Sequence, residues 1–404
     1  MTAFGIVLAL VQGLWAIGWV VYVVWLPGLV QQAGMLADWV PWLLILDQWV
    51  FALSDLVCGV AADRLRRQLR RFGPWLMAMM GLSALAFLLL PWAARAQMPA
   101  LFLVLTLVWT ATSSALRAPV MALLGRHVSA QQLAWPTGLW LFGLGVAGAL
   151  APYLQPRVRE LSPDLAFALP AVALMLAASA LIWAERQLGR TEETPPSPTP
   201  SSTPVPLWAA RPRIVGLPGW GLFLGAVALA ALGFQIHFPV NAAPQFLQLN
   251  PSATLETLLP LFWVGFNLAL WPASRLSQRL GGVGTMAVGC TVAAWASAAG
   301  AASDTLPALI ACQVLAGAAW ACVLLSASSA ATNAGRTGYE GLASGGCFAL
   351  LALAAMARMT MAAGQGFQHP GVVPWLNVAP AFSWMLAAVL LLVLWRRQRC
   401  ERGA

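Results

Sequence analysis

The sequence predicts an all-α membrane protein with twelve transmembrane helices in two six-helix bundles and both termini in the cytoplasm. Its 404 residues are 60% hydrophobic and only 9% charged, whereas a soluble protein carries about 25% charged residues. The apolar residues form runs long enough to cross a bilayer, which takes about 20 residues of helix. A polar stretch then divides these runs into two equal sets.

The predicted helices follow one another along the chain with short loops between them. The first set covers residues 5–30, 39–61, 74–94, 99–124, 134–154 and 165–186. The second set covers residues 215–240, 257–274, 283–301, 306–331, 341–364 and 374–396. Between them, residues 190–206 read RTEETPPSPTPSSTPVP, which is too rich in Pro, Ser and Thr to pack a core. We therefore expect an N-terminal bundle (1–189), a cytoplasmic linker (190–214) and a C-terminal bundle (215–404).

The positive charge predicts the orientation. With both termini inside, the cytoplasmic loops hold Arg64, Arg66, Arg67, Arg70, Arg71, Arg126, Arg186, Arg190, Arg211, Arg213, Arg275, Arg279, Arg336, Arg396, Arg397, Arg399 and Arg402. The outer loops hold only Arg95, Arg157 and Arg159. Arginine in cytoplasmic loops is the usual pattern of membrane proteins, so the net charge of +9 needs no nucleic acid to explain it. We expect a monomeric, multi-pass protein of the plasma (inner) membrane, surrounded by lipid.

The polar residues do not form the motifs of an enzyme. The sequence contains no glycine-rich nucleotide loop, no cluster of metal ligands and no nucleophile with a neighbouring base. Its six cysteines are scattered without metal-type or disulfide-type spacing. The N-terminus lacks a basic segment and a cleavage site, so residues 5–30 are interpreted as a helix that is retained rather than a signal peptide. We therefore expect no enzymatic activity, no cofactor and no bound metal.

Carboxylates and arginines come together in one stretch, residues 46–74. Asp47 and Asp55 lie inside the predicted helix 39–61, and Asp63 and Arg64 follow at its cytoplasmic end. A carboxylate inside a membrane helix is costly unless it is paired or wet, so these residues indicate a functional site.

The chain resembles the major facilitator superfamily in its layout and in one motif. The layout is two sets of six helices joined by a linker, and the motif is Gly59-x3-Asp63-Arg64 after the second helix. A weak repeat, GVAADRLRRQL in the first half and LWPASRLSQRLGG in the second, is typical of a transporter built from two related halves. A closer similarity, to the glycoside–pentoside–hexuronide cation symporter branch, rests on Asp55, Gly59, Asp63, Arg67, Arg71 and Pro74. Phe51 stands where that branch carries a further carboxylate, which favours a proton over sodium as the coupling ion.

The resemblance implies a secondary active transporter that moves a small solute by alternating access. Proton coupling is expected because membrane carboxylates and a histidine are available. Import by symport and efflux by antiport both stay open. The alternative is a non-transporting membrane sensor or assembly factor built on a transporter scaffold.

The resemblance also implies a latch at the cytoplasmic end. Asp63 should lie against the N-terminus of the eleventh helix, near Gly341, where the helix dipole favours a negative charge. Gly59 and Arg64 belong to the same motif and are therefore part of the predicted latch.

Deeper in the membrane, Asp55 and Arg117 are predicted at similar depth. They can form a permanent ion pair, or Asp55 can carry a proton while Arg117 binds an anionic group of the solute bidentately. Gln235, His237 and Asn267 are further candidates for the cavity wall. For His237, a hydrogen-bonded packing role stands beside a role in proton transfer.

A gate is predicted at the outer side. Asp47 and Arg358 lie at similar distances from the outer ends of the second and eleventh helices, which face each other in the family that the chain resembles. We expect the two charges to meet when the outer halves of the bundles close. The alternative is that each is satisfied separately within its own bundle.

Overall fold

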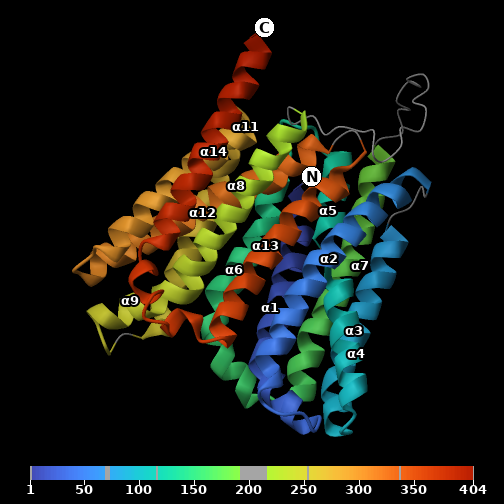
Figure 1. The fold of residues 1–404 in the computed structure, drawn as a ribbon. Helices are drawn as coiled ribbons and strands as arrows, with labels where there is room; N and C mark the ends of the chain where they lie inside the picture. The colour runs from blue at the N-terminus through green and yellow to red at the C-terminus, as the bar shows by residue number, and fades with distance from the viewer. Residues whose placement is uncertain are drawn as a thin grey trace.

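The computed structural model describes residues 2–68, 73–114, 117–191, 216–252, 254–335 and 338–403. Within these residues the secondary structure is helical and contains no strand. Eleven of the helices are long and apolar enough to cross a membrane. Figure 1 shows them running side by side between two ends of the molecule. The prediction of an all-α membrane protein is therefore confirmed.

The described residues of the N-terminal half form seven helices. They are α1 (Thr2–Gln32), α2 (Trp39–Gln68), α3 (Gly73–Arg95), α4 (Pro99–Ser113), α5 (Ala118–His127), α6 (Ala134–Glu160) and α7 (Pro163–Thr191). Residues 99–122 form one candidate membrane span, as predicted for 99–124, but the described helix is not continuous and consists of α4 and α5. Pro119 lies in the first turn of α5. Because proline has no backbone N–H, a helix that continued through it would lose one backbone hydrogen bond. Arg117, at the start of α5, accordingly has non-helical backbone angles (φ −112°, ψ −81°).

The C-terminal half contains the remaining elements. They are α8 (Gly216–Ile236), the π-helix η2 (His237–Asn241), α9 (Ala242–Leu249), α10 (Leu255–Leu258), α11 (Pro260–Ala301), α12 (Leu306–Ala334), α13 (Glu340–Ala363), the 3₁₀ turns η3 (Gly366–Gln368) and η4 (Val373–Trp375), and α14 (Ala379–Gly403). The helix predicted over 215–240 continues through η2 to Leu249. Pro239 cannot donate a backbone hydrogen bond, and the wider π turn accommodates this loss without ending the helix.

The long helix α11 reverses its direction at Gly281. Gly265 lies against Val314 of α12, and Gly300 lies against Cys312, one turn or less away on the same helix. A straight helix would separate Gly265 from Gly300 by about 50 Å, so the chain must turn back between them. Gly281 has φ 77° and ψ 163°, a conformation that glycine adopts without a steric penalty. The segments predicted as 257–274 and 283–301 are therefore the two arms of α11, which is counted as one of the eleven spans.

The predicted cytoplasmic segments gather at one end of the molecule, which we call the arginine-rich end. The indole of Trp395, in α14, donates a 3.2 Å hydrogen bond to the carbonyl of Leu280, beside the reversal of α11. The amide of Asn333, at the end of α12, donates to the carbonyl of Ala130 in the loop between α5 and α6, over 3.3 Å. Figure 1 shows the start of α1 and the end of α14 at this same end. This end is defined by Arg64, Arg275, Arg279, Arg396, Arg397 and Arg399.

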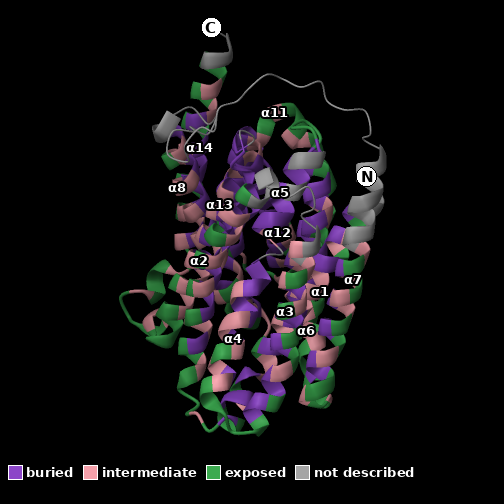
Figure 2. Cartoon of the chain, turned by 90° about the vertical axis from the view of Figure 1, so that its right-hand side faces the viewer, coloured by how far each residue is buried: buried purple, intermediate pink, exposed green. Residues whose placement is uncertain are grey.

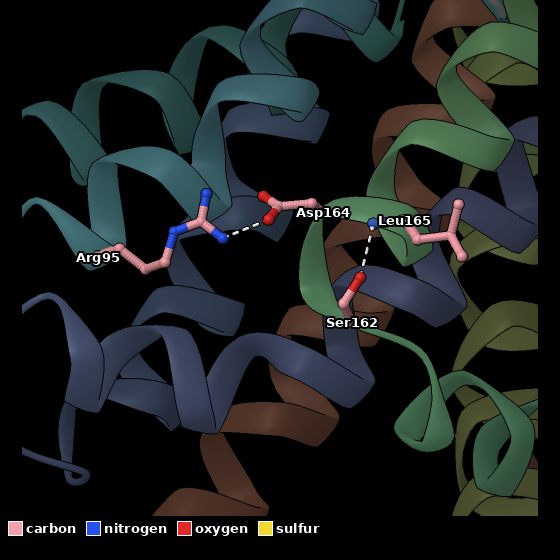
Figure 3. A network of polar contacts seen from close by, with 4 residues as sticks. All are labelled: Arg95, Ser162, Asp164 and Leu165. Atoms are coloured by element: carbon pink, nitrogen blue, oxygen red, sulfur yellow. Dashed lines mark hydrogen bonds and ion pairs between the residues drawn. The ribbon is translucent and has the colours of Figure 1, made fainter.

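An ion pair joins two helices at the opposite end. Arg95, the last residue of α3, contacts Asp164 in the first turn of α7, and the backbone N–H of Leu165 donates to the hydroxyl of Ser162 over 3.4 Å (Figure 3). Both charged side chains are about half exposed. Water screens such a pair, so it orients the start of α7 more than it stabilises the fold.

The two halves pack against each other along two pairs of helices. In the first pair, α2 lies against α13, with Phe51 in a cluster with Ala349 and Ala352. In the second pair, α6 lies against α11, where Gly145 and Gly148 leave room for larger side chains of α11. Both pairs join one helix from each half, so a candidate site on α2 or α6 can respond to movement of the other half.

The outward-facing sides of the helices are apolar. Figure 2 shows exposed residues along the outer sides of the helices and buried residues toward the interior. The exposed large side chains include Trp49, Leu53, Leu176, Leu268, Trp295 and Phe382. An apolar outer surface of this extent suits lipid rather than water.

The predicted linker cannot be compared with the structure. Helix α7 extends to Thr191, and residues 192–215, which hold nearly all of the linker, lie outside the described residues.

Candidate functional site

Five residues of α2 follow one another at intervals of four: Asp47, Phe51, Asp55, Gly59 and Asp63. Each step of four residues turns by about 40° around the helix axis, so the row winds from Asp47, which faces α1 and α4, to Asp63, which faces α13. We call this row the α2 stripe. At 1.5 Å per residue, its two ends are about 24 Å apart along the helix axis. The stripe therefore presents three carboxylates at three depths of the molecule.

Asp63, at the arginine-rich end of the stripe, binds the start of α13. Its Oδ1 accepts a 2.8 Å hydrogen bond from the backbone N–H of Gly341, and its Oδ2 accepts one of 2.9 Å from Leu342. The side chain is buried. The first N–H groups of a helix have no partner within the helix, and the dipole favours an anion there. The resemblance implied this contact, and the structure contains it.

Gly59 lies one turn deeper, where the backbones of α2 and α13 approach most closely. A Cβ atom on Gly59 would collide with the backbone carbonyl of Gly341, and one on Gly341 would collide with that of Gly59. Arg64, next to Asp63, is exposed. Two of the predicted latch residues, Gly59 and Asp63, are therefore buried against α13. The third, Arg64, lies at the surface.

Asp55 and Arg117 form an ion pair in the interior of the N-terminal half. Arg117 Nη2 lies 3.0 Å from Asp55 Oδ2, and their side chains are 13% and 0% exposed. The guanidinium carbon lies 4.5 Å from the ring centre of Phe51 and 5.4 Å from that of Trp15. The two rings stabilise the cation through their negative faces while they exclude water.

This ion pair leaves hydrogen-bonding capacity unused. Among the residues that the structure describes, the two atoms at 3.0 Å do not meet hydrogen-bond geometry, and Arg117 Nε and Nη2 and both Asp55 oxygens have no partner that meets it. Arg117 is the N-cap residue of α5 and has non-helical backbone angles. A Cβ on Gly345 of α13 would collide with the backbone carbonyl of Asp55. The pair therefore lies beside the other half of the molecule.

Asp47, at the other end of the stripe, is fully buried and bound by two hydroxyl groups. Tyr22 of α1 donates to its Oδ2 and Thr110 of α4 donates to its Oδ1, each over 2.8 Å. Arg358 of α13, the predicted partner, instead donates from Nε to Gln235 Oε1 over 2.9 Å. Asp47 and Arg358 therefore do not meet in this conformation. The gate stays a prediction for a conformation in which the ends of the two halves away from the arginine-rich end are closed.

The C-terminal half holds the remaining candidates, Gln235, His237 and Asn267, away from the Asp55–Arg117 ion pair. His237, the first residue of η2, is buried, with Nε2 3.1 Å from Gln313 Oε1 and Nδ1 without a partner. Gln313 in turn donates to Gln245 Oε1 over 3.4 Å. Asn267 lies on α11 against Gly145 of α6, and its Oδ1 is buried without a partner. Gln235 therefore contacts Arg358, whereas His237 and Asn267 occupy separate positions.

The sequence did not single out Tyr22, Thr110 or Gln313, although each binds a candidate residue. All three are polar side chains inside apolar runs, and each is buried. A buried polar group needs a hydrogen-bond partner, so their presence in predicted membrane helices was a usable signal. Their partners, on other helices, were not readable from the sequence. Within the part of the chain that the structure describes, no group of His, Cys, Asp and Glu could hold a metal ion.

The sequence model of the Major Facilitator Superfamily matches residues 8–359, which is most of the chain. The chain belongs to the Major Facilitator Superfamily. This family consists of transporters and not of enzymes, so the chain is a multi-pass membrane transporter that carries a small solute by secondary transport. No curated protein sequence is similar enough to this member of the family to be matched to it.

Solved structures of the family share the fold. FucP, the E. coli fucose:proton symporter, in its outward conformation, has a TM-score of 0.65 at 15% identity, over 96% of this chain and 97% of its own. The human organic anion transporter MFSD10 (TETRAN) has a TM-score of 0.66 at 18% identity, over 98% of each chain. An outward-facing bacterial homologue of the iron transporter ferroportin has a TM-score of 0.69 at 13% identity, over 97% of this chain and 99% of its own. At such identities the likeness shows the fold alone.

Proposed function

We propose that this family member couples the movement of a small solute to a proton by alternating access. The observation that carries the proposal is the ion pair Asp55–Arg117, which lies in an apolar interior against α13 of the other half. A change in the position of α13 would reach the pair directly. A site that senses the relative position of the halves is what alternating access requires.

The solute that suits this site carries an anionic or strongly hydrogen-bonding group. Within the described part of the chain, Arg117 Nε and Nη2 have no hydrogen-bond partner, and a guanidinium binds a carboxylate through two parallel hydrogen bonds. The names of two structural neighbours, an organic anion transporter and a fucose:proton symporter, support an anion or a sugar as the first classes to test.

The proposed topology has twelve crossings, with both termini and the linker in the cytoplasm. The reversal at Gly281 gives α11 two arms, and the arginine-rich end suits the cytoplasmic face. In this arrangement the Asp63–Gly341 contact closes the cytoplasmic side. The plasma membrane is the proposed location.

The test is a ligand screen followed by a flux assay. The purified protein is heated with a panel of monosaccharides, including L-fucose, and of small carboxylic acids. A ligand at 100 times its dissociation constant stabilises the folded state by about 2.7 kcal/mol. Solutes that stabilise the protein are then added to proteoliposomes that contain a pH-sensitive dye. We expect at least one of them to drive proton movement.

Two variants make the screen specific. Arg117→Gln should lose the stabilisation by the solute, and Arg275→Gln, which changes an exposed arginine stacked on Trp271, should keep it. Stabilisation without solute or proton movement would favour the non-transporting sensor. Failure of every solute in both assays would contradict the proposed function.

A further inference from the structure

Asp47 is enclosed where three helices of the N-terminal half meet. It lies about two turns from the start of α2, and its side chain is inaccessible to solvent. Tyr22 of α1 and Thr110 of α4 each contribute a hydroxyl at 2.8 Å, one to each carboxylate oxygen. The carboxyl group is therefore held on both sides by groups from other helices.

Aromatic rings surround this position. The ring of Tyr22 lies 4.6 Å from that of Trp109 and 5.5 Å from that of Trp19, between ring centres. Phe87 packs on the far side of Trp109, with 5.0 Å between ring centres. Water is thereby kept from the Tyr22 hydroxyl and from the carboxyl group that it binds.

The groups that face Asp47 include no cation. Tyr22 is the one titratable residue of α1, while α4 has none and α3 has only Arg95, its last residue, which is paired with Asp164. On its own helix the neighbouring carboxylate is Asp55, which is paired with Arg117. On α13 the cation is Arg358, which donates to Gln235. Among the residues that the structure describes, no salt bridge therefore reaches Asp47.

The two hydroxyl partners suit both protonation states of the carboxyl group. A hydroxyl can donate or accept a hydrogen bond. When Asp47 is ionised, both hydroxyls donate to it. When a proton is bound to Oδ2, that oxygen can donate to the Tyr22 hydroxyl while Thr110 still donates to Oδ1. The same heavy-atom positions therefore serve both states.

Asp55 differs from Asp47 because its partner, Arg117, has hydrogen-bond donors and no acceptor. A proton on Asp55 would leave the Arg117 guanidinium as an unpaired charge in the interior, which is strongly unfavourable. The two interior carboxyl groups of the α2 stripe thus differ in environment. The surroundings of Asp55 suit the charged form, and those of Asp47 suit the binding and release of a proton.

We propose that Asp47 is a reversible proton-binding site, with Tyr22 and Thr110 as its hydrogen-bond partners. The proton comes from water at the end of the molecule where α2 begins, forms an O–H bond on Asp47, and returns to water when that bond breaks. No other bond changes. Proton binding at Asp47 rests on its geometry, and its use for coupling rests on the proposed function.

Infrared spectroscopy of the full-length protein in lipid nanodiscs tests the assignment, with the proton itself as the probe. Because exposed carboxyl groups also protonate on acidification, the test uses the separate C=O band of a carboxyl group buried away from water, which acidification should produce in the wild type. The band should be lost in Asp47→Asn. It should remain in the double variant Asp55→Asn/Arg117→Gln, which removes the other interior carboxyl group together with its counter-charge.

Two further variants keep the test sharp if Asp47→Asn does not fold. Tyr22→Phe and Thr110→Val each remove one hydrogen bond and should shift the frequency of the band. The matched controls are Tyr153→Phe, at an exposed tyrosine, and Thr112→Val, whose hydroxyl bonds the backbone of Val108. Both controls should leave the band unchanged.

Each outcome supports or overturns the assignment. If the band of the buried carboxyl group persists in Asp47→Asn, or is absent from the wild type, proton binding at Asp47 is overturned. In proteoliposomes, Asp47→Asn should lower solute-driven proton movement at least tenfold, and movement within twofold of the wild type overturns its coupling role. If the wild type moves no proton with any solute, the proposed function fails while the infrared assignment stands.

Discussion

Asp63 Oδ1 lies 2.8 Å from the backbone nitrogen of Gly341, so a carboxylate of one half binds the first turn of a helix of the other half. The contact joins residues 278 positions apart in the chain. It holds the two halves together at the arginine-rich end, and the direct way to test its importance is to weaken it.

Asp63→Asn should favour separation of the halves at this end. The amide loses the negative charge that the helix dipole stabilises, which is worth about 1 kcal/mol, or about fivefold in population. Spin labels at the exposed positions Gln131 and Arg279, on opposite halves, should report a larger share of long distances. The control Arg397→Gln, at an exposed arginine of the same end, should leave the distances as in the wild type. An unchanged distribution in Asp63→Asn would remove support for a latch.

Gly59→Ala should separate the halves by a steric route. The added methyl group collides with the backbone of Gly341, and overpacking of this kind costs about 1–3 kcal/mol. The same pair of labels should show the same lengthening as in Asp63→Asn. Gly346→Ala is the matched control, because a Cβ at this position of α13 meets no atom within 4 Å. Equal effects of the two alanine substitutions would argue against close backbone contact.

Asp55→Asn and Arg117→Gln should each destabilise the protein more than their combination does. Removal of one partner leaves a buried charge unpaired, at a cost of about 3–5 kcal/mol. The melting temperature and expression level of the double variant should therefore exceed those of both single variants. Arg157→Gln breaks an exposed pair with Glu160 and should change stability by less than about 1 kcal/mol. A double variant that is no better than the singles would favour separate solute-binding roles.

The predicted gate gives a test by double substitution. If Asp47 and Arg358 meet when the outer ends close, Asp47→Asn and Arg358→Gln should each widen the distance between labels at Asp38 and Ala363. The combination should widen it no further, because either change already removes the contact. A coupling of about 1–3 kcal/mol corresponds to a shift of about 5- to 150-fold. Additive effects would show that the two side chains act independently.

Cleavage of residues 190–206 should leave the two halves associated. The segment is rich in proline and polar residues, and such segments are accessible to proteases. The packing of α2 on α13 and of α6 on α11 does not depend on it. Protease added to inside-out vesicles should cut the chain, and the fragments should migrate together on a native gel. Resistance to protease would contradict the two-bundle layout with an exposed cytoplasmic linker.

The sequence by itself determined the class of protein and the approximate place of each helix. Long apolar runs leave a chain no stable alternative to membrane helices, because backbone groups in lipid must be paired within each segment. The spacing of Asp47, Asp55, Gly59 and Asp63 also fixed their relative depth, because each residue advances a helix by about 1.5 Å. The break between residues 274 and 283 was predicted, and Gly281 lies within it. The break before Pro119 was missed, because a run of apolar residues does not show where its backbone turns.

Only the tertiary structure decided which side chains meet. Asp47 was expected to face Arg358, and it binds Tyr22 and Thr110, which lie 25 and 63 positions away on other helices. Depth along a helix follows from counting residues, but rotation toward a particular neighbour depends on how all the helices pack. That packing is set by many small contacts summed over the whole molecule. The partners of the interior charges are therefore a property of the fold and not of any one segment.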